Sequence, residues 1–166
     1  PGASFHRDVV GIEADENPEP DAPTFRVRVT SVHGGDRVVA LGLDARDEVL
    51  LHQREIPGPC GGAASIVAAA RASDGVEIPY LRFAGADAGP GPRPILLEAY
   101  GSYGSVFDPG FDAGRCALLN RGVDFAIAWV RGGGELGEPW HQAGQRRRRL
   151  TAIDDLLAVA EHLIAG

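Results

Sequence analysis

Residues 123–137 read VDFAIAWVRGGGELG, an almost wholly apolar run followed directly by a glycine-rich loop. A short apolar run without alternation is typical of a strand that is covered on both faces. This stretch therefore predicts a buried strand over 123–130.

The segments on either side of this strand alternate between strand and helix patterns. Upstream, ILLEAY at 95–100 is a second short apolar run, and FDAGRCALLNR at 111–121 fits a helix. Downstream, TAIDDLLAVAEHLI at 151–164 places apolar residues on one helical face, and Thr151 with Asp154 resembles a capping box. The order strand, helix, strand, helix predicts a parallel sheet with right-handed crossovers.

The N-terminal part of the chain has a different pattern. Residues 8–24 contain six acids and three prolines without apolar periodicity, which predicts a solvated loop or linker. Alternating runs over 25–55 predict an antiparallel meander, and the Gly/Pro-rich residues 56–62 indicate a domain boundary. The remaining expectations are turns at 33–36 and 44–47 and two β-like runs over 65–85.

Composition limits the class of protein. The chain has 166 residues, 44% apolar and 23% charged, with a formal charge of −7, which predicts a packed domain and argues against nucleic acid as a partner. No apolar run approaches the roughly 18–20 residues that cross a bilayer, and the start lacks a signal-peptide pattern. We therefore expect a cytoplasmic protein without a membrane partner. Because the chain begins at Pro1 and contains no Met, we also expect a piece of a longer protein.

Few residues suggest metal or cofactor chemistry. Cys60 and Cys116 are too few and too far apart for a disulfide framework or a zinc site, so we expect two buried apolar fillers. The five histidines show no paired metal spacing, and no cofactor is expected. The arginines at 146–149 indicate a solvated face, with a partner-binding patch as the alternative.

The glycine run could belong to a nucleotide site. The stretch from Gly132 to Gly137 satisfies G-x-G-x-x-G, and Asp154 and Asp155 lie near the spacing of a ribose-binding acid. That mechanism requires the glycines to open a helix, whereas the next clear helical pattern begins about thirteen residues later. A loop whose glycines let the backbone pass close to a neighbouring element is the interpretation we favour.

A serine nucleophile is not apparent in this chain. The G-x-S-x-G pattern of a nucleophile elbow does not occur. Ser102 and Ser105 lie among glycines but lack the required flanks, so we interpret them as turn residues.

Three stretches, taken in order, resemble the catalytic domain of the prolyl oligopeptidase family of serine peptidases, and most closely its oligopeptidase B branch, which cleaves after basic residues. They are LLEAYGSYGSVFDPGF at 96–111, ALLNRGVDFAIAWVRGGGELGEPWHQAGQ at 117–145 and IDDLLAVAEHLI at 153–164. QREIPG at 53–58 and ARASDGVEIPYLRF at 70–83 resemble, more weakly, the end of that family's β-propeller and the re-entry into its hydrolase domain.

The resemblance implies an α/β fold. Residues 61–166 would form the N-terminal half of an α/β-hydrolase sheet, and residues 1–60 would be an acidic linker and the last antiparallel strands of a β-propeller. The family's Ser, Asp and His would all lie beyond the equivalent of Gly166.

The resemblance also assigns two site residues. Tyr100 matches the tyrosine whose hydroxyl contributes to the oxyanion hole, and Asp108 matches an acid that recognises basic side chains. A second family acid would fall on Gly110. The departures from the family are Glu98 and Ala99 in place of Tyr-Gly, and Thr151 and Ala152 in place of Asn-Thr.

The resulting hypothesis is a fragment of a serine-type oligopeptidase that hydrolyses short peptides after basic residues through an acyl-enzyme. Without the triad, this chain should be inactive alone. The alternatives are a nucleotide-binding module built on Gly132 to Gly137 and a non-catalytic, hydrolase-like interaction protein.

Overall fold

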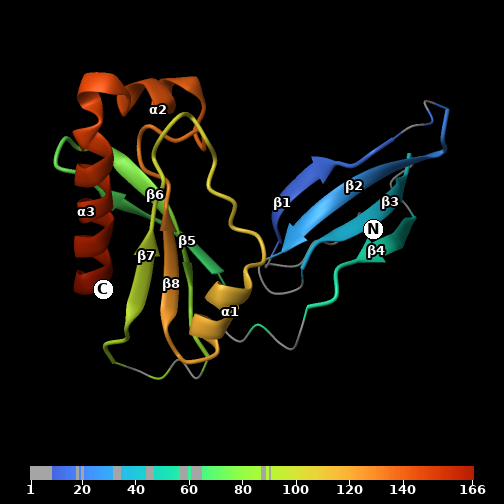
Figure 1. Cartoon of the computed structure of the whole chain (residues 1–166), viewed down its shortest axis with the longest axis horizontal. Helices are drawn as coiled ribbons and strands as arrows, with labels where there is room; N and C mark the ends of the chain where they lie inside the picture. The colour runs from blue at the N-terminus through green and yellow to red at the C-terminus, as the bar shows by residue number, and fades with distance from the viewer. Residues whose placement is uncertain are drawn as a thin grey trace.

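Two four-stranded sheets make up most of the regular structure in the described part of the chain (Figure 1). The computed structural model describes residues 9–17, 19, 21–31, 35–43, 47–56, 60, 65–86, 89 and 91–166. The turn expected at 33–36, the turn at 44–47 and the boundary at 56–62 lie largely outside these residues.

The first sheet is an antiparallel meander in the order β1-β2-β3-β4. The strands are β1 (Val9–Ala14), β2 (Thr24–Ser31), β3 (Arg37–Gly42) and β4 (Glu48–Gln53). Alternation along β2 buries Val27 and Val29, which pack with Val39 of β3. The meander expected over 25–55 is thus confirmed.

β1 corrects the expectation of a loop or linker over residues 8–24. It pairs with β2, and the acids near it face an arginine of that strand. Asp15 accepts a hydrogen bond from Arg28 Nη2 at 2.9 Å, and Glu13 lies 3.8 Å from Arg28 Nε. Cross-strand charge pairs stabilise a strand that has no apolar alternation of its own.

The second sheet has the order β5-β6-β8-β7. Its strands are β5 (Ser65–Arg71), β6 (Glu77–Phe83), β7 (Ile95–Glu98) and β8 (Asp124–Ala128). β7 and β8 are parallel, as expected for a strand–helix–strand unit, but β6 pairs antiparallel with both β5 and β8. The parallel pairing expected for the runs at 95–100 and 123–130 is therefore confirmed. The sheet as a whole is mixed, because the two β-like runs over 65–85 form a hairpin that joins it in antiparallel orientation.

Two helices cover opposite faces of this sheet. α1 (Ala113–Leu119) packs Leu119 against Phe83, Phe125 and Ile127, whereas α3 (Leu150–Ala165) packs Val159 on the other face. All five residues of β8 are buried, as expected for a strand covered on both faces. No described helix is both long and apolar enough to cross a membrane.

The remaining helical elements lie between β8 and α3. They are α2 (Glu138–Ala143) and the 3-10 helix η1 (Arg146–Arg148). α3 begins at Leu150, with Arg149 as its N-cap and no side-chain capping bond. The capping box expected from Thr151 and Asp154 is therefore wrong, because Thr151 already lies inside the helix.

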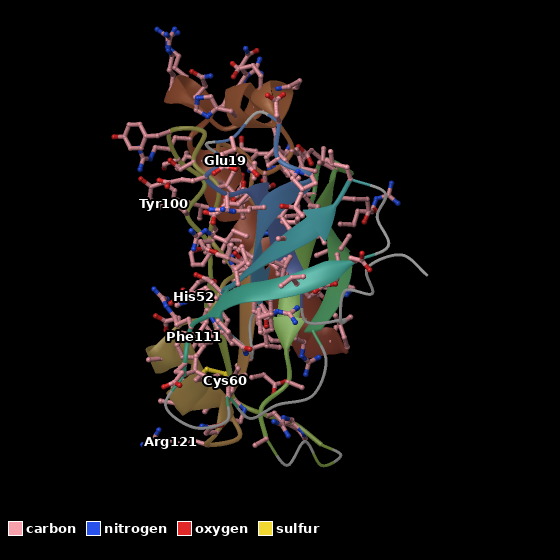
Figure 2. The ribbon with its side chains drawn as sticks, turned by 90° about the vertical axis from the view of Figure 1, so that its right-hand side faces the viewer. Glu19, His52, Cys60, Tyr100, Phe111 and Arg121 are labelled. Carbon is pink, nitrogen blue, oxygen red and sulfur yellow. A yellow bond between two sulfur atoms is a disulfide. The ribbon has the colours of Figure 1, made fainter. Side chains whose placement is uncertain are left out.

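Cys60 and Cys116 form a disulfide, which corrects the expectation of two unlinked fillers. Their Cα atoms are 4.9 Å apart although the residues are separated by 56 positions, and Figure 2 shows the yellow bond beside α1. Both cysteines pack in the cluster of Phe83 and Leu119, so the expected burial is confirmed. The bond ties the segment before β5 to α1.

A buried carboxylate stands at the start of β8. Asp124 accepts hydrogen bonds from the Gly85 N–H at 2.9 Å, from Arg82 Nη2 at 2.6 Å and from Arg93 Nε at 2.9 Å. Burial alone would raise the pKa of Asp124, but these donors and their charge hold it below its ordinary value.

Acid is expected to destabilise the chain through Asp124. Because its pKa is lower in the folded state, its contribution is fully present at neutral pH and is lost as the pH falls below about 4. Asp124→Asn should lower the free energy of unfolding by about 3 kcal/mol at pH 7 and by less at pH 3. Urea unfolding at both pH values, with exposed Asp154→Asn as the control, measures this. An equal loss at both pH values contradicts the assignment.

Candidate active site

A cavity of about 810 Å³ runs along β7 on the side of the sheet where α1 packs. Its walls come from β7 and Tyr100, from the loop at 105–112, from α1, and from Phe125 of β8. After β7 the chain passes over the end of the sheet and descends to α1 (Figure 1). Several residues of this segment, from Ser105 to Asp112, line the cavity. We refer to it as the Tyr100 cavity.

Tyr100 lies two residues beyond the carboxyl end of β7. Its side chain lines the Tyr100 cavity and is 52% exposed. Its hydroxyl forms no hydrogen bond with the residues that the structure describes. The geometry leaves the hydroxyl available to a ligand, unlike that of a buried aromatic side chain bonded to a backbone carbonyl.

The glycine run holds the loop that carries Tyr100. The Gly104 N–H donates to the Gly132 carbonyl at 3.1 Å, and the Gly134 N–H donates to the Ser105 carbonyl at 3.0 Å. A Cβ on Gly132 would overlap the carbonyl oxygen of Gly101, and one on Gly134 would overlap that of Gly104. The favoured interpretation of these glycines, close passage of two backbone segments, is confirmed.

A helix does follow the glycine run, because α2 begins directly after Gly137, and the expectation that the next helix begins about thirteen residues later is therefore wrong. An acid near the run nevertheless argues against the nucleotide alternative. Asp155, one of the two acids at ribose-binding spacing, is fully buried. It accepts four hydrogen bonds from the backbone N–H, Nε and Nη2 of Arg131, at 2.5–3.1 Å. Arg131 also donates to Asp74 at 2.5 Å, which joins the β5–β6 turn to α3. The carboxylate of Asp155 is therefore already bonded to Arg131 and is not available to bind a ribose hydroxyl.

Asp108 lines the Tyr100 cavity together with Tyr100. Its Oδ1 accepts a hydrogen bond from the Gly110 N–H at 2.8 Å, an Asx-turn that shapes the loop. Glu135 fixes the same loop from the glycine run, because its Oε1 accepts from the Phe107 N–H at 3.0 Å. Asp108 thus has a structural bond on one oxygen, while the carboxylate as a whole borders the cavity.

Arg115 also lines the cavity, although no sequence motif points to it. Its Nη1 donates to the carbonyls of Pro109 and Gly110 at 2.9 and 2.8 Å, and its guanidinium lies 4.6 Å from the centre of the Phe125 ring. Burial lowers the pKa of Arg115 below its ordinary value, while the charges of nearby carboxylates, Asp112 first, oppose this. An arginine in a short helix gives no sequence signal of burial, so only the packing reveals it.

The arginines at 146–149 are all exposed. They form η1 and its C-cap between α2 and α3, away from the lining of the Tyr100 cavity. This placement agrees with a solvated face.

Known proteins are similar to this chain in sequence and in fold. The sequence profile of the prolyl oligopeptidase family matches residues 109–166. Protease 2 from Moraxella lacunata is 46% identical over 74 residues, which are 45% of this chain and 11% of that protein. Dipeptidyl aminopeptidase BI from Pseudoxanthomonas mexicana is 32% identical over 163 residues, 93% of this chain and 22% of that protein. The solved structure of oligopeptidase B from Leishmania major matches with a TM-score of 0.74 at 31% identity, over 89% of this chain and 21% of that one.

These relatives and the solved structure are all peptidases by name. The chain belongs to the prolyl oligopeptidase family of serine peptidases. It spans 11% and 22% of the two curated relatives, so most of each relative has no counterpart here.

Proposed function

We propose that this chain is part of a serine-type oligopeptidase that hydrolyses short peptides after basic residues. The observation that carries the proposal is that Tyr100 and Asp108 line one cavity. Residues 1–60 would then contain the last strands of a β-propeller, and residues 61–166 the first half of the hydrolase domain. The similarity to oligopeptidase B supports this assignment. We also propose a cytoplasmic location, in which Cys60 and Cys116 would be kept as thiols instead of the disulfide.

In the proposed reaction, Tyr100 stabilises charge that forms during acyl transfer. A serine elsewhere in the complete protein attacks the peptide carbonyl, its proton passes to a histidine, and the carbonyl oxygen becomes an oxyanion. The Tyr100 hydroxyl donates a hydrogen bond to that oxygen. The amine then leaves with the proton, and water hydrolyses the serine ester. A donor aimed at the oxyanion lowers the barrier because it acts where charge develops.

Asp108 would recognise the substrate rather than take part in bond cleavage. Its carboxylate borders the cavity and could pair with the cationic end of an arginine or lysine side chain. The Asx-turn on Oδ1 holds the carboxylate in place.

Asp108→Asn tests this role in the complete enzyme. It should raise KM about tenfold for substrates with a basic residue before the cleaved bond and leave neutral substrates unchanged, because a charge-assisted bond contributes about 1.5 kcal/mol or more. Steady-state kinetics on arginyl and neutral amides measures the difference. Equal effects on both substrates would assign Asp108 to the turn alone.

The 166-residue chain by itself is expected to hydrolyse no peptide or ester above background. The physical reason is that the chain contains no G-x-S-x-G nucleophile elbow. The measurement combines arginyl and prolyl amide substrates with a serine-directed phosphonate and mass spectrometry. Covalent labelling of a serine in this chain would contradict the proposal. Stabilisation by NAD or ATP in a thermal-shift titration would instead favour the nucleotide-binding alternative.

A further inference from the structure

Glu98 shares the wall of the Tyr100 cavity with Tyr100 itself. Alternation along β7 and the residues after it places Leu96, Glu98 and Tyr100 on the cavity side. The intervening Leu97 and Ala99 pack on the opposite side with the cluster around Val159 of α3. The strand therefore presents a carboxylate two positions before the proposed oxyanion donor.

The charges around the cavity are predominantly negative. Glu98, Asp108 and Asp112 line it, against the single guanidinium of Arg115. That guanidinium is held by backbone carbonyls and aromatic rings, and it forms no ion pair with a carboxylate in the part of the chain that the structure describes. Its charge acts on all three acids from a distance, so the cavity keeps an excess of negative charge.

The three carboxylates differ in whether they form hydrogen bonds with the rest of the chain. Asp112 caps α1 by accepting from the Arg115 N–H at 2.7 Å, and Asp108 accepts from the Gly110 N–H. Glu98 has neither a hydrogen bond nor an ion pair to any residue that the structure describes. Both of its oxygens are available to a ligand.

The walls between the charges are apolar. They are formed by aliphatic and aromatic side chains: Leu96, Val106, Phe107, Phe111, Leu118 and Phe125. An arginine or lysine side chain has an apolar stem and a cationic end, and therefore matches apolar walls with a carboxylate beyond them.

We propose that Glu98 is a specificity-determining residue, whose carboxylate binds the cationic end of a substrate side chain together with Asp108. The inference rests on the proposed function, because it takes the Tyr100 cavity as the substrate site. This role would explain why Glu98 stands where the family has Tyr. The second acid that the family resemblance places at position 110 is replaced by Gly110, and Glu98 supplies a second negative charge from β7.

Binding to the 166-residue chain tests this assignment directly. The probes are N-acetylarginine methylamide and its neutral isostere N-acetylcitrulline methylamide, titrated by NMR at low salt. We expect the arginine probe to bind at least tenfold more tightly than the citrulline probe. Glu98→Gln should weaken binding of the arginine probe about tenfold and leave the citrulline probe unchanged. Glu161→Gln, an exposed acid on α3, is the matched control and should change neither affinity.

Equal affinity of the two probes for the native chain would overturn the assignment, as would an unchanged arginine affinity in Glu98→Gln. If the NMR spectrum shows that Glu98→Gln disturbs the fold, Glu98→Asp and Glu98→Tyr are used in its place. Arginine binding that is retained in Glu98→Asp and lost in Glu98→Tyr supports the role of Glu98.

Experiments on the complete protein distinguish failure of this inference from failure of the proposed function. Charge-dependent probe binding without peptidase activity would refute the proposed function and leave the Glu98 site standing. Peptidase activity whose preference for basic over neutral substrates is unchanged by Glu98→Gln would refute the role of Glu98 alone.

Discussion

Replacing Tyr100 with Phe in the complete enzyme is expected to lower kcat about 100- to 1000-fold, with little change in KM. The hydroxyl forms no bond within the described residues, and its side chain is half exposed at the cavity. Its removal should therefore leave the ground state and the fold largely intact, while the oxyanion loses a donor in the transition state. Steady-state kinetics and the melting temperature of the same variant measure the two effects.

Tyr80→Phe is the matched control for loss of a hydroxyl. Tyr80 is buried on the α3 side of the sheet, away from the lining of the Tyr100 cavity, so kcat should not change. A Tyr100→Phe variant with a lower melting temperature and native kcat would show that the residue is structural.

Replacing both Cys60 and Cys116 with Ser is expected to lower the free energy of unfolding of the oxidised chain by about 4 kcal/mol. The bond closes a loop of 56 residues in sequence separation, and a crosslink of that length restricts the unfolded chain strongly. Denaturant unfolding of the oxidised chain, the reduced chain and the double variant measures the contribution. The reduced chain and the double variant should unfold at similar denaturant concentrations.

Two further results test the stability contribution of this bond and its redox state in the cell. Equal stability of the oxidised and reduced chains would mean that the crosslink contributes nothing. The disulfide also makes the cytoplasmic expectation testable, because cytoplasmic thiols are normally kept reduced. Alkylation of free thiols in intact cells should trap Cys60 and Cys116 as thiols if the protein resides in that compartment.

Periodicity explains why much of the fold could be predicted. The almost wholly apolar run around β8 matches a strand whose five residues, Asp124 included, are all buried between α1 and α3. The alternation of β2 matches a sheet with one buried face. For β8 and β2, the pattern that predicts the element is also the pattern that buries it. The helical pattern of α3 correctly predicts the helix but only part of its packing face, because Leu156 and Leu163 pack with Val159 whereas Ile153, Leu157 and Ile164 are exposed.

Features that depend on contacts between distant residues could not be predicted in this way. β1 (VVGIEA) pairs with β2 along its length, but the acids and prolines that follow it at 15–23 give the whole segment the composition of a loop. The Cys60–Cys116 bond joins positions that no local pattern relates. β6 pairs antiparallel with β8, and the hydrophobic pattern of a strand does not specify which other strand it pairs with.

The candidate site divides in the same way. Tyr100 and Asp108 could be named from the family resemblance, and the structure places both on one cavity. Arg115 and Glu98 could not be assigned to that cavity from sequence, because their positions follow from how α1 packs on the sheet and from which side of β7 faces it.

Labelling of the complete protein with a serine-directed phosphonate during hydrolysis of an arginyl amide shows whether this chain is part of a working serine peptidase. We expect hydrolysis, stoichiometric labelling of one serine outside residues 1–166, and slow labelling when Tyr100 is replaced by Phe. A complete protein that neither hydrolyses the amide nor reacts with the phosphonate would contradict the claim that this chain belongs to a working serine peptidase.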